Sequence, residues 1–245
     1  MSSTSNSSLS SSSSQSHRVF DPTIVPVVAR DSHLPTVDTS LLSADGMRAR
    51  FLKDLPWDVE LTDENRAARS SEGARRAGRG SEPTPASVLI PVVAYEHELK
   101  ILLTQRTSHL HDHPGQISFP GGRADPDDLS AEHTALREAH EEIGLPAERI
   151  EVLGRLPHYL TITGYQVTPV VGLVVPGHDY QADPFEVADI FEVPMSFLMN
   201  PHHHEHRLWQ SPEGPRRFYA MPYENKFIWG ATAGMLRNLY HFLRA

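Results

Sequence analysis

The sequence predicts a fold of the α/β or α+β class in which helices pack against a mixed β-sheet. Two apolar runs of strand length, at 87–95 and 99–106, are separated only by a short polar stretch and predict a β-hairpin. An amphipathic helix is predicted over 131–143, with Gly144 as its end signal. Strands and helices alternate irregularly along the chain, which is why the sheet is predicted to be mixed.

The remaining elements follow from the same patterns of apolar residues. Residues 150–175 contain at least two further strand-like segments, and 186–201 is predicted as a strand followed by a helix. Residues 226–243 predict a closing amphipathic helix. Before the hairpin, 47–55 predicts a short helix, and the basic, Gly-, Ser- and Pro-rich segment 65–87 predicts an exposed loop or linker.

Composition and charge argue against several classes of function. A net charge of −9 disfavours a general affinity for nucleic-acid backbones or anionic membranes, so neither is expected as a partner. The chain has no cysteine, which excludes disulfides, thiolate catalysis and cysteine-ligated zinc and fits a reducing compartment. Residues 1–18 are serine-rich and lack the apolar region of a signal peptide, so they predict a disordered leader. A cytoplasmic location is therefore expected.

Three glutamates crowd one face of the helix at 131–143. Glu138, Glu141 and Glu142 stand at positions i, i+3 and i+4, near the helix C-terminus, where the helix dipole disfavours negative charge. Each like-charge pair costs ~0.2–0.5 kcal/mol, unless a cation compensates. A hard divalent cation such as Mg²⁺ would do so, whereas a solvated acidic face is the alternative. The preceding "FPGG" at 119–122 favours the cation, because its tight backbone turn suits the close approach of a ligand or metal.

These glycines, the helix and its glutamates together resemble the Nudix box, whose pattern is G-x5-E-x7-R-E-U-x-E-E-x-G-U, with U an aliphatic residue. The chain departs from the pattern in one place. The spacing from Gly122 to Arg137 is one residue longer, and an acidic loop replaces the early glutamate, with Asp128 as the nearest equivalent. Ala139 is a small residue at an aliphatic position. The matching residues are Gly122, Arg137, Glu138, Ala139, Glu141, Glu142, Gly144 and Leu145.

The segment before the glycines is similar to one branch of this family, the coenzyme A pyrophosphatases. "LLTQRTSHLHDHPGQISFPGG" at 102–122 resembles the extended motif LLT-x-R-S/A-x3-R-x3-G-x3-FPGG of those enzymes. Thr107 replaces the small Ser or Ala, and His111 stands where the motif has its second Arg. Because a mostly neutral imidazole grips phosphate less firmly than a guanidinium, ADP-ribose, dinucleotides and oxidised nucleotides stay open as alternative substrates.

The resemblance implies an α/β/α sandwich around a mixed β-sheet. It places the Nudix hydrolase domain at 86–245, after the leader and an N-terminal extension with its basic linker at 19–85. It implies hydrolysis of the pyrophosphate bond of coenzyme A, or of a derivative, to 4′-phosphopantetheine and adenosine 3′,5′-bisphosphate, with Mg²⁺ or Mn²⁺ as cofactor. A binding module that senses a nucleotide without cleaving it is the alternative class, and the intact box glutamates argue against it. The oligomeric state is left open, with a homodimer as one candidate.

The resemblance also implies roles for individual residues of the box. Glu138 and Glu142, one helical turn apart, are expected to bind the metal directly, with Glu141 completing the set. Arg137 is expected to hold the glutamates in position by ion pairing. The general base is either Glu141 or a carboxylate from a later loop, for which Glu186 is the candidate.

Substrate contacts are expected from the segment before the helix. Arg106 is the expected pyrophosphate contact, because a planar guanidinium suits phosphate oxygens. His111, Gly121 and Gly122 complete the expected substrate-binding set.

Two further features are given structural interpretations. Tyr165 and Trp229 are interpreted as core residues, with stacking on an adenine ring as the alternative. The histidine-rich run "PHHHEHR" at 201–207 is interpreted as a solvated loop, with metal binding as the alternative.

Overall fold

The structure is a computed structural model that describes residues 20–70, 82–110, 114–211 and 214–245, so the predicted leader at 1–18 lies outside the described residues. Short 3₁₀ turns occur at Pro22–Ile24, Thr39–Leu41, Ala147–Arg149 and Pro201–His203. The α-helices are α1 (Ala44–Phe51), α2 (Asp63–Arg69), α4 (Ala131–Ile143), α5 (Met195–Leu198) and α6 (Gly230–Arg244). The strands are β1 (Val27–Arg30), β2 (Thr84–Ala94), β3 (Leu99–Arg106), β4 (Ile117–Ser118), β5 (Gly121–Arg123), β6 (Ile150–Arg155), β7 (Tyr159–Leu160), β8 (Tyr165–Val174), β9 (Val187–Pro194), β10 (Glu205–Ser211), β11 (Gly214–Tyr223) and β12 (Lys226–Trp229).

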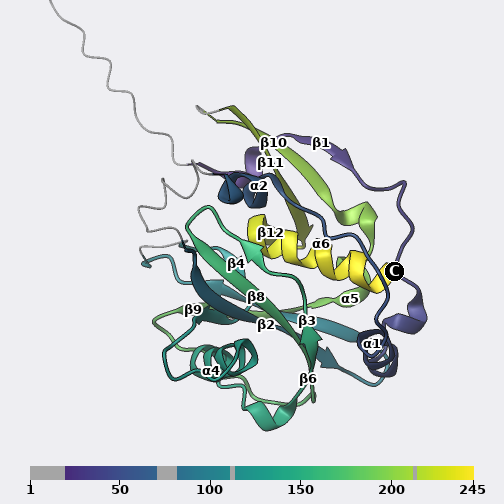
Figure 1. The fold of residues 1–245 in the computed structure, drawn as a ribbon, viewed down its shortest axis with the longest axis vertical. Helices are drawn as coiled ribbons and strands as arrows, with labels where there is room; N and C mark the ends of the chain where they lie inside the picture. Colours follow the sequence, from purple (N-terminus) through teal and green to yellow (C-terminus); the bar gives the residue numbers. More distant parts are fainter. Residues whose placement is uncertain (1–19, 71–81, 111–113, 212–213) are drawn as a thin grey trace, which may run out of the picture.

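The main sheet is mixed, as the sequence predicts. Its strand order is β4-β3-β2-β8-β6, with β5 paired to β2, β7 to β8 and β9 to β3. Strands β2 and β8 run parallel, whereas β2 and β3 form the predicted antiparallel hairpin. Helix α4 covers one face of this sheet and α6 the other (Figure 1). The α/β/α arrangement predicted from the family resemblance is therefore confirmed.

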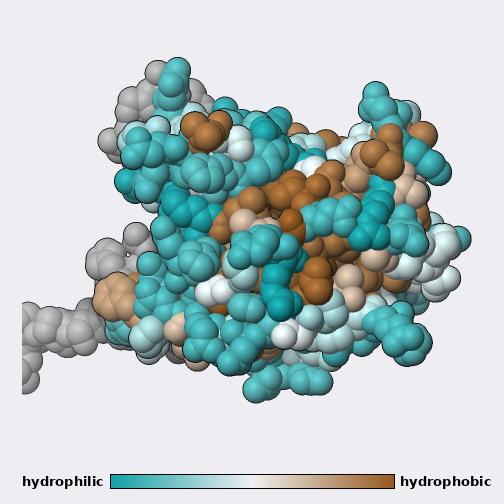
Figure 2. All heavy atoms as spheres, turned by 90° about the horizontal axis from the view of Figure 1, so that it is seen from below, coloured by the Kyte–Doolittle hydropathy of each residue, from teal (hydrophilic) through white to brown (hydrophobic). Residues whose placement is uncertain are grey.

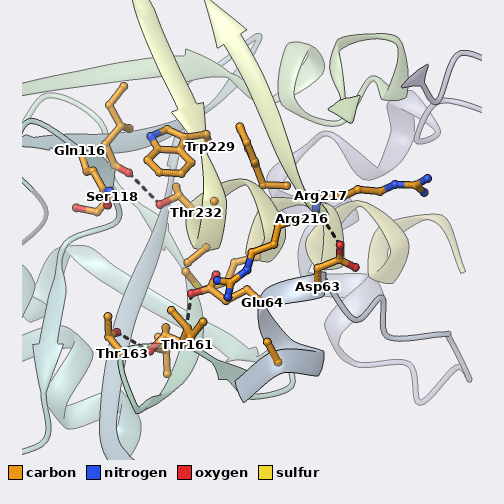
Figure 3. A pocket seen from close by; sticks show the side chains of 18 of the residues that line it. Asp63, Glu64, Gln116, Ser118, Thr161, Thr163, Arg216, Arg217, Trp229 and Thr232 are labelled. Atoms are coloured by element: carbon orange, nitrogen blue, oxygen red, sulfur yellow. Dashed lines mark hydrogen bonds between the residues drawn. The ribbon is translucent and has the colours of Figure 1, made fainter. Parts of the chain in front are cut away.

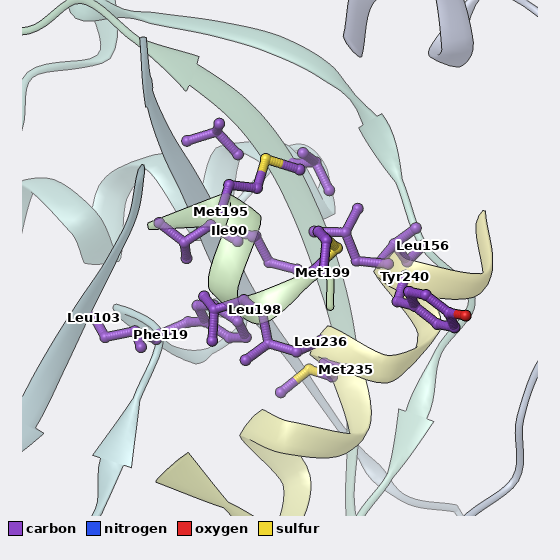
Figure 4. Packing of buried hydrophobic residues seen from close by; sticks show 14 of the residues in the cluster. Ile90, Leu103, Phe119, Leu156, Met195, Leu198, Met199, Met235, Leu236 and Tyr240 are labelled. Atoms are coloured by element: carbon purple, nitrogen blue, oxygen red, sulfur yellow. The ribbon is translucent and has the colours of Figure 1, made fainter. Parts of the chain in front are cut away.

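The central strand β2 shows why the sheet carries a core on each face. Successive side chains of a strand point to opposite faces, and β2 is apolar at almost every position. Leu89 and Val93 pack in the cluster that contains α4, whereas Ile90 and Val92 pack in the cluster that contains α6. Figure 4 shows part of the second cluster, with the labelled residues Ile90, Leu103, Phe119, Leu156, Met195, Leu198, Met199, Met235, Leu236 and Tyr240.

A second sheet, of strand order β1-β10-β11-β12, lies beyond α6, and the sequence patterns did not predict it (Figure 1). The interpretation of 201–207 as a solvated loop is wrong. His204 is fully buried, and its Nε2 lies 2.7 Å from the Leu198 carbonyl oxygen. The charged side chains of β10 are buried in pairs, with Arg207 Nη2 2.7 Å from Glu205 Oε2. Polar residues that form hydrogen bonds and ion pairs with one another can be buried. In the sequence, such residues give the same polar pattern as a solvated loop.

Three other boundaries differ from the prediction. The segment 226–243 is not one helix, because Lys226–Trp229 pairs with β11 as β12 and the helix begins only at Gly230. The segment 65–87 is not all loop, because it contains most of α2 and the start of β2. Helix α2 begins at a capping box formed by Thr62 and Asn65. The basic residues that follow it in the sequence predict a loop, so this helix start was missed. The short helix expected at 47–55 is present as α1, which begins three residues earlier, at Ala44.

Residues before β2 are held against α6 and β11 by a largely buried network of ion pairs and hydrogen bonds. Glu60 Oε2 lies 2.7 Å from Arg237 Nη2 and 2.9 Å from His241 Nε2, both on α6. The Tyr219 hydroxyl of β11 also donates to Glu60, and Arg237 Nη1 lies 2.8 Å from Asp31 Oδ2. Although burial opposes it, the hydrogen bond from His241 and the charge of Arg237 lower the pKa of Glu60 to about 2.

Replacing Glu60 by Gln is expected to lower the free energy of unfolding at pH 7 by about 3 kcal/mol. The carboxylate, with a lowered pKa in the folded state, stabilises the protein above pH 4.5 and loses this effect as the pH falls toward about 2. Urea titrations across this range should therefore show the difference between wild type and variant shrinking in acid. Glu96→Gln is the matched control, because that side chain is 88% exposed. A difference that is the same at pH 7 and pH 3 would contradict this account.

The outer surface is mixed in polarity. On the face shown in Figure 2, hydrophilic residues surround a band of hydrophobic ones. Apolar surface of this kind is common, because a folded chain has too few polar atoms to cover itself. Within the described residues, no helix has the length and apolar character needed to cross a membrane.

Candidate active site

A glycine pair brings the loop before α4 into contact with both the sheet and the helix. Strand β5 pairs with β2, with Gly121 opposite Val88 and Gly122 opposite Ser87. A Cβ at Gly121 would lie 2.4 Å from the Ser87 carbonyl oxygen, and one at Gly122 would lie 2.5 Å from Glu138 Oε1. A side chain at position 121 would clash with the backbone of β2, and one at position 122 would displace the Glu138 carboxylate. The two glycines therefore allow the loop to pack closely on both the sheet and this carboxylate.

Helix α4 forms over the residues that its apolar periodicity predicts. Ser130 caps its start by accepting a hydrogen bond from the His133 N–H, and Gly144 ends it in the left-handed conformation, with φ +65°. Ala135 and Ala139 are fully buried against the sheet. The helix is therefore held by its apolar face, and this orientation places the glutamates at the edge of the sheet beside β5.

The three glutamates of α4 have different surroundings. Glu142 is 5% exposed, and its Oε2 accepts a long hydrogen bond of 3.4 Å from the Gly121 N–H. Glu138 is mostly buried beside Gly122, with 16% of its side chain exposed. Glu141 is 56% exposed. The sequence pattern places all three glutamates on one face of the helix. In the structure, packing buries two of them and leaves the third near solvent.

Burial disfavours the ionised forms of two glutamates of this site. Burial and the neighbouring Glu186 carboxylate raise the pKa of Glu142 to about 8, although the nearby Arg106 opposes this. Burial also raises the pKa of Glu138, despite the pairing of this carboxylate with Arg137. Two buried carboxylates whose ionised forms are disfavoured lie one turn apart, so the site favours an added cation.

Arg106 and Glu186 reach this site from the sheet. Arg106 pairs with Val187 at the end of β3, and the Thr107 N–H donates to the Glu186 carbonyl oxygen at 3.0 Å. This pairing places Arg106 Nη1 3.9 Å from Glu186 Oε2 and 4.0 Å from Glu142 Oε1. The guanidinium therefore lies between two carboxylates that are far apart in the sequence.

Arg137 links the acidic loop to the helix. Its Nε and Nη2 donate to Asp128 at 3.1 and 2.9 Å, and its Nη1 lies 3.0 Å from Glu138 and 2.9 Å from Glu141. Thr134 also donates to Asp128, and hydrogen bonds from Arg137 hold the pKa of this carboxyl well below its usual range. Asp128, which occupies the place of the early box glutamate, is therefore the main partner of Arg137.

A cavity of about 630 Å³ has Arg106 and Gly121 in its lining, and both of these residues lie beside Glu142. Figure 3 shows other lining residues of this cavity, among them Trp229 and Thr232. Its other walls come from α2, β4, β11, the segment 161–163 and the start of α6. This volume lies within the range of small-molecule sites. Five aromatic residues contribute to the lining, and one of them, Phe119, also belongs to the core. The sequence analysis did not group the other four: Phe20, Trp209, Phe218 and Trp229.

The structure brings most of the expected site residues together. Those that meet around the buried carboxylates are Arg106, Gly121, Gly122, Arg137, Glu138, Glu142 and Glu186. Glu141 joins them only through Arg137, and His111 lies outside the described residues.

Of the two aromatic residues interpreted as core, one differs from that expectation. Trp229 is only partly buried and lines the cavity. Tyr165 is also partly buried, and its hydroxyl accepts a hydrogen bond of 3.2 Å from Arg123 Nη2. The interpretation of Trp229 as a core residue is therefore wrong, whereas Tyr165 packs against the larger core cluster as a partly buried residue.

A glycine loop, an acidic helix and a ligand-sized cavity on an α/β/α sandwich define the Nudix class of hydrolases. The chain belongs to this family, since the model of the NUDIX domain matches residues 83–219. Two similar relatives are uncharacterized Nudix hydrolases named NudL. The protein from Enterobacter sp. (strain 638) is 44% identical over 164 residues, which cover 63% of this chain and 80% of the relative. The protein from Yersinia pestis (strain Pestoides F) is 46% identical over 155 residues, which cover 63% and 77%.

Solved structures of Nudix proteins are also similar to this chain. The Nudix hydrolase RenU from M. smegmatis is 24% identical, with a TM-score of 0.42, over 51% of this chain and 80% of that chain. The Ap4A hydrolase from C. elegans is 17% identical, with a TM-score of 0.40, over 48% of this chain and 85% of that chain.

Nudix hydrolases use divalent metal ions, and the residues of this site fit such an ion. Within the described residues, no three His, Asp or Glu side chains are grouped so that they hold a metal by themselves. Mg²⁺ does not need such a group, because it binds through one or two carboxylates and takes water and substrate phosphate as its other ligands. Glu138 and Glu142 supply two carboxylates whose charge is otherwise poorly compensated.

Proposed function

We propose that this protein hydrolyses the pyrophosphate bond of coenzyme A or of a coenzyme A derivative, with Mg²⁺ or Mn²⁺ as cofactor. Water adds across the anhydride to give 4′-phosphopantetheine and adenosine 3′,5′-bisphosphate. The observation that carries this proposal is the position of Arg106, which lines the cavity and also lies 4.0 Å from Glu142 Oε1. When the pyrophosphate is bound beside Arg106, the cavity can hold the rest of the substrate. The extended motif at 102–122 favours coenzyme A over ADP-ribose or a dinucleotide.

Glu138 and Glu142 are the proposed metal ligands. A divalent cation between them would stabilise the ionised carboxylates, which burial disfavours. When bound, such a cation neutralises pyrophosphate charge and lowers the pKa of the attacking water. Glu141 is the proposed third ligand, but its side chain is 56% exposed, whereas those of Glu138 and Glu142 are mostly buried, which favours the latter two as the primary pair.

Glu186 is favoured over Glu141 as the general base. Its carboxylate is 43% exposed and lies beside Arg106, the proposed pyrophosphate contact. Glu141 is instead held by Arg137 on the solvent side of the helix. A general base must lie within reach of the water that it deprotonates, and this water attacks the pyrophosphate. Glu186, beside the proposed pyrophosphate contact, meets this condition more directly than Glu141.

Glu186→Gln is therefore expected to lower kcat about 10²- to 10⁴-fold, and Glu141→Gln to lower it less. Mn²⁺ affinity, measured by titration calorimetry, should change little in Glu186→Gln, because this residue is not a proposed ligand. The reverse order of the two effects on kcat would assign the base to Glu141.

The proposal is tested by incubating the purified protein with coenzyme A and Mg²⁺ or Mn²⁺ and separating the products by chromatography. Adenosine 3′,5′-bisphosphate is expected with the intact protein and not with Glu138→Gln. If neither metal supports cleavage of coenzyme A, the coenzyme A assignment is wrong. Cleavage of ADP-ribose or of a dinucleotide in the same assay would then identify another Nudix pyrophosphatase, and binding without cleavage would indicate a nucleotide-sensing module.

Arg137→Met is expected to weaken Mn²⁺ binding about 10- to 100-fold, because residues that orient metal ligands commonly have effects of this size. Without the guanidinium, Glu138 and Glu141 lose a shared partner, and Asp128 is left buried without its cation. Titration calorimetry with Mn²⁺ measures the change. Arg155→Met is the matched control, because Arg155 pairs with Glu132 at the other end of the helix. Equal Mn²⁺ affinity in both variants would show that Arg137 does not position the ligands.

A further inference from the structure

We propose that four aromatic residues of the cavity bind the adenine ring of the substrate and that the Gln116 side chain recognises the edge of this ring. The four residues, here called the aromatic wall, are Phe20, Trp209, Phe218 and Trp229. This inference rests on the proposed function, because it assigns the nucleotide half of the substrate to the cavity beside the proposed catalytic residues.

The aromatic wall is connected to the proposed pyrophosphate contact through β4. The Arg106 N–H donates to the Gln116 carbonyl oxygen at 2.9 Å, directly before β4. The next residue, Ile117, accepts a hydrogen bond of 2.9 Å from Thr232 Oγ1, in the first turn of α6. Trp229 lies three residues before Thr232, and β12 packs against β4. Arg106 and Trp229 both line this cavity, and Figure 3 shows the surroundings of Trp229 in it.

The rings of the aromatic wall are not stacked in parallel on one another. Phe20 and Trp209 have centroids 4.3 Å apart and are tilted by 43°. Trp229 meets Phe20 and Phe218 at 5.8 and 5.4 Å, with interplanar angles of 60° and 66°. Such tilted contacts hold the rings in place without covering their faces completely. A planar base can stack on the faces that line the cavity, because every nucleobase has a π-face.

The other half of the proposed substrate fits this wall less well. The pantetheine arm is flexible and carries amide groups, which require hydrogen-bond partners when they are buried. A cluster of aromatic rings supplies few such partners, whereas a purine ring gains stacking energy from it. Of the two halves, the aromatic wall therefore favours the adenine nucleotide.

Gln116 supplies the polar group that such a site needs for discrimination. Its side chain lines the cavity, and Figure 3 shows it on the same side as Trp229. Within the part of the chain that the structure describes, its carboxamide makes no hydrogen bond, and only its main-chain carbonyl is engaged. A Gln carboxamide pairs with the amino group and N7 of adenine through two hydrogen bonds, whereas guanine offers only acceptors at these positions. Gln116 should therefore favour adenine over guanine.

Part of this site comes from outside the segment that defines the family. Phe20 precedes β1, and α2 forms another wall, whereas the NUDIX domain match begins at residue 83. The N-terminal extension thus contributes directly to the proposed base-binding site. Phe20→Ala is expected to weaken adenine binding in the same direction as changes at Trp229.

The test is quenching of tryptophan fluorescence in full-length Trp57→Phe protein, in EDTA. Trp57 packs on Phe242 outside the cavity, so the remaining signal comes from Trp209 and Trp229. The probes are adenosine 3′,5′-bisphosphate, guanosine 3′,5′-bisphosphate and 4′-phosphopantetheine. Saturable quenching is expected with the adenosine probe at the lowest concentration. Strongest quenching by 4′-phosphopantetheine would overturn the proposal.

Variants separate the aromatic wall from Gln116. Trp229→Leu, followed by the quenching of Trp209, is expected to weaken adenosine bisphosphate binding roughly 5- to 150-fold. Trp229→Phe, which keeps a ring, should retain most of the affinity and controls for misfolding. Gln116→Ala should bring the adenosine and guanosine affinities close together, whereas Tyr95→Leu, at an exposed site outside the cavity, should leave both unchanged. Unchanged affinity in Trp229→Leu would refute the role of the wall, and an unchanged base preference in Gln116→Ala would refute the role of Gln116.

The outcomes distinguish this inference from the proposed function. Cleavage of coenzyme A without quenching by adenosine bisphosphate would leave the proposed function intact and overturn the inference. Quenching that depends on Trp229, without cleavage of coenzyme A, would support an adenine site and reject coenzyme A as the substrate.

Discussion

Glu142→Gln is expected to lower kcat about 100-fold or more and, in the absence of divalent metal, to raise the thermal stability of the protein. The first effect follows from the loss of a proposed metal ligand, which should exceed the 10- to 100-fold effect typical of residues around a metal site. The second follows from burial. Glu142 is 5% exposed, and its carboxylate lies near those of Glu138 and Glu186. Removing this poorly compensated charge relieves repulsion and desolvation.

Both effects are measurable on one preparation. Product chromatography at saturating Mg²⁺ gives kcat, and calorimetry in EDTA gives the melting temperature. Glu132→Gln is the matched control, because Glu132 lies on the same helix and pairs with Arg155 away from the buried carboxylates. Its kcat should equal that of the wild type. An active Glu142→Gln protein would remove this residue from the proposed ligands, and an inactive protein with a lowered melting temperature would indicate a structural role.

Arg106→Met is expected to lower kcat/KM roughly 10- to 150-fold. A hydrogen bond to a charged group contributes about 1.5–3 kcal/mol, and each 1.4 kcal/mol corresponds to a factor of ten. Arg106 is the proposed donor to the pyrophosphate, and it also lies between Glu142 and Glu186. Without its positive charge these carboxylates repel each other more strongly, so Mn²⁺ affinity is not expected to weaken. This combination separates a substrate contact from a metal-positioning residue.

The measurement for Arg106 is steady-state kinetics combined with Mn²⁺ titration. Arg106→Lys keeps the charge but loses the planar fork, and we expect it to recover only part of kcat/KM. Arg123→Met is the control, because the Arg123 side chain contacts Tyr165 and not the buried glutamates. A loss of Mn²⁺ affinity in Arg106→Met, with substrate binding unchanged, would contradict the assignment.

The sequence by itself predicts the parts of the site whose causes are local. The α4 helix follows from the spacing of Ala135, Ala139 and Ile143 and from its end signal at Gly144, and all of these act within a few turns. The β2–β3 hairpin follows from two apolar runs and a short polar connection. The box pattern of glycines, arginine and glutamates is likewise contiguous, so the family can be predicted before any contact is known.

Only the tertiary structure determined which charged side chains of the site and which aromatic side chains of the cavity lie next to one another. The pairing of β3 with β9 places Arg106 beside Glu186, and the packing of β5 on α4 buries Glu142 while Glu141 stays near solvent. The aromatic wall joins residues from the N-terminal extension and from strands that sequence patterns missed. Burial and charge compensation depend on neighbours distant in the chain, and local periodicity carries no information about those neighbours.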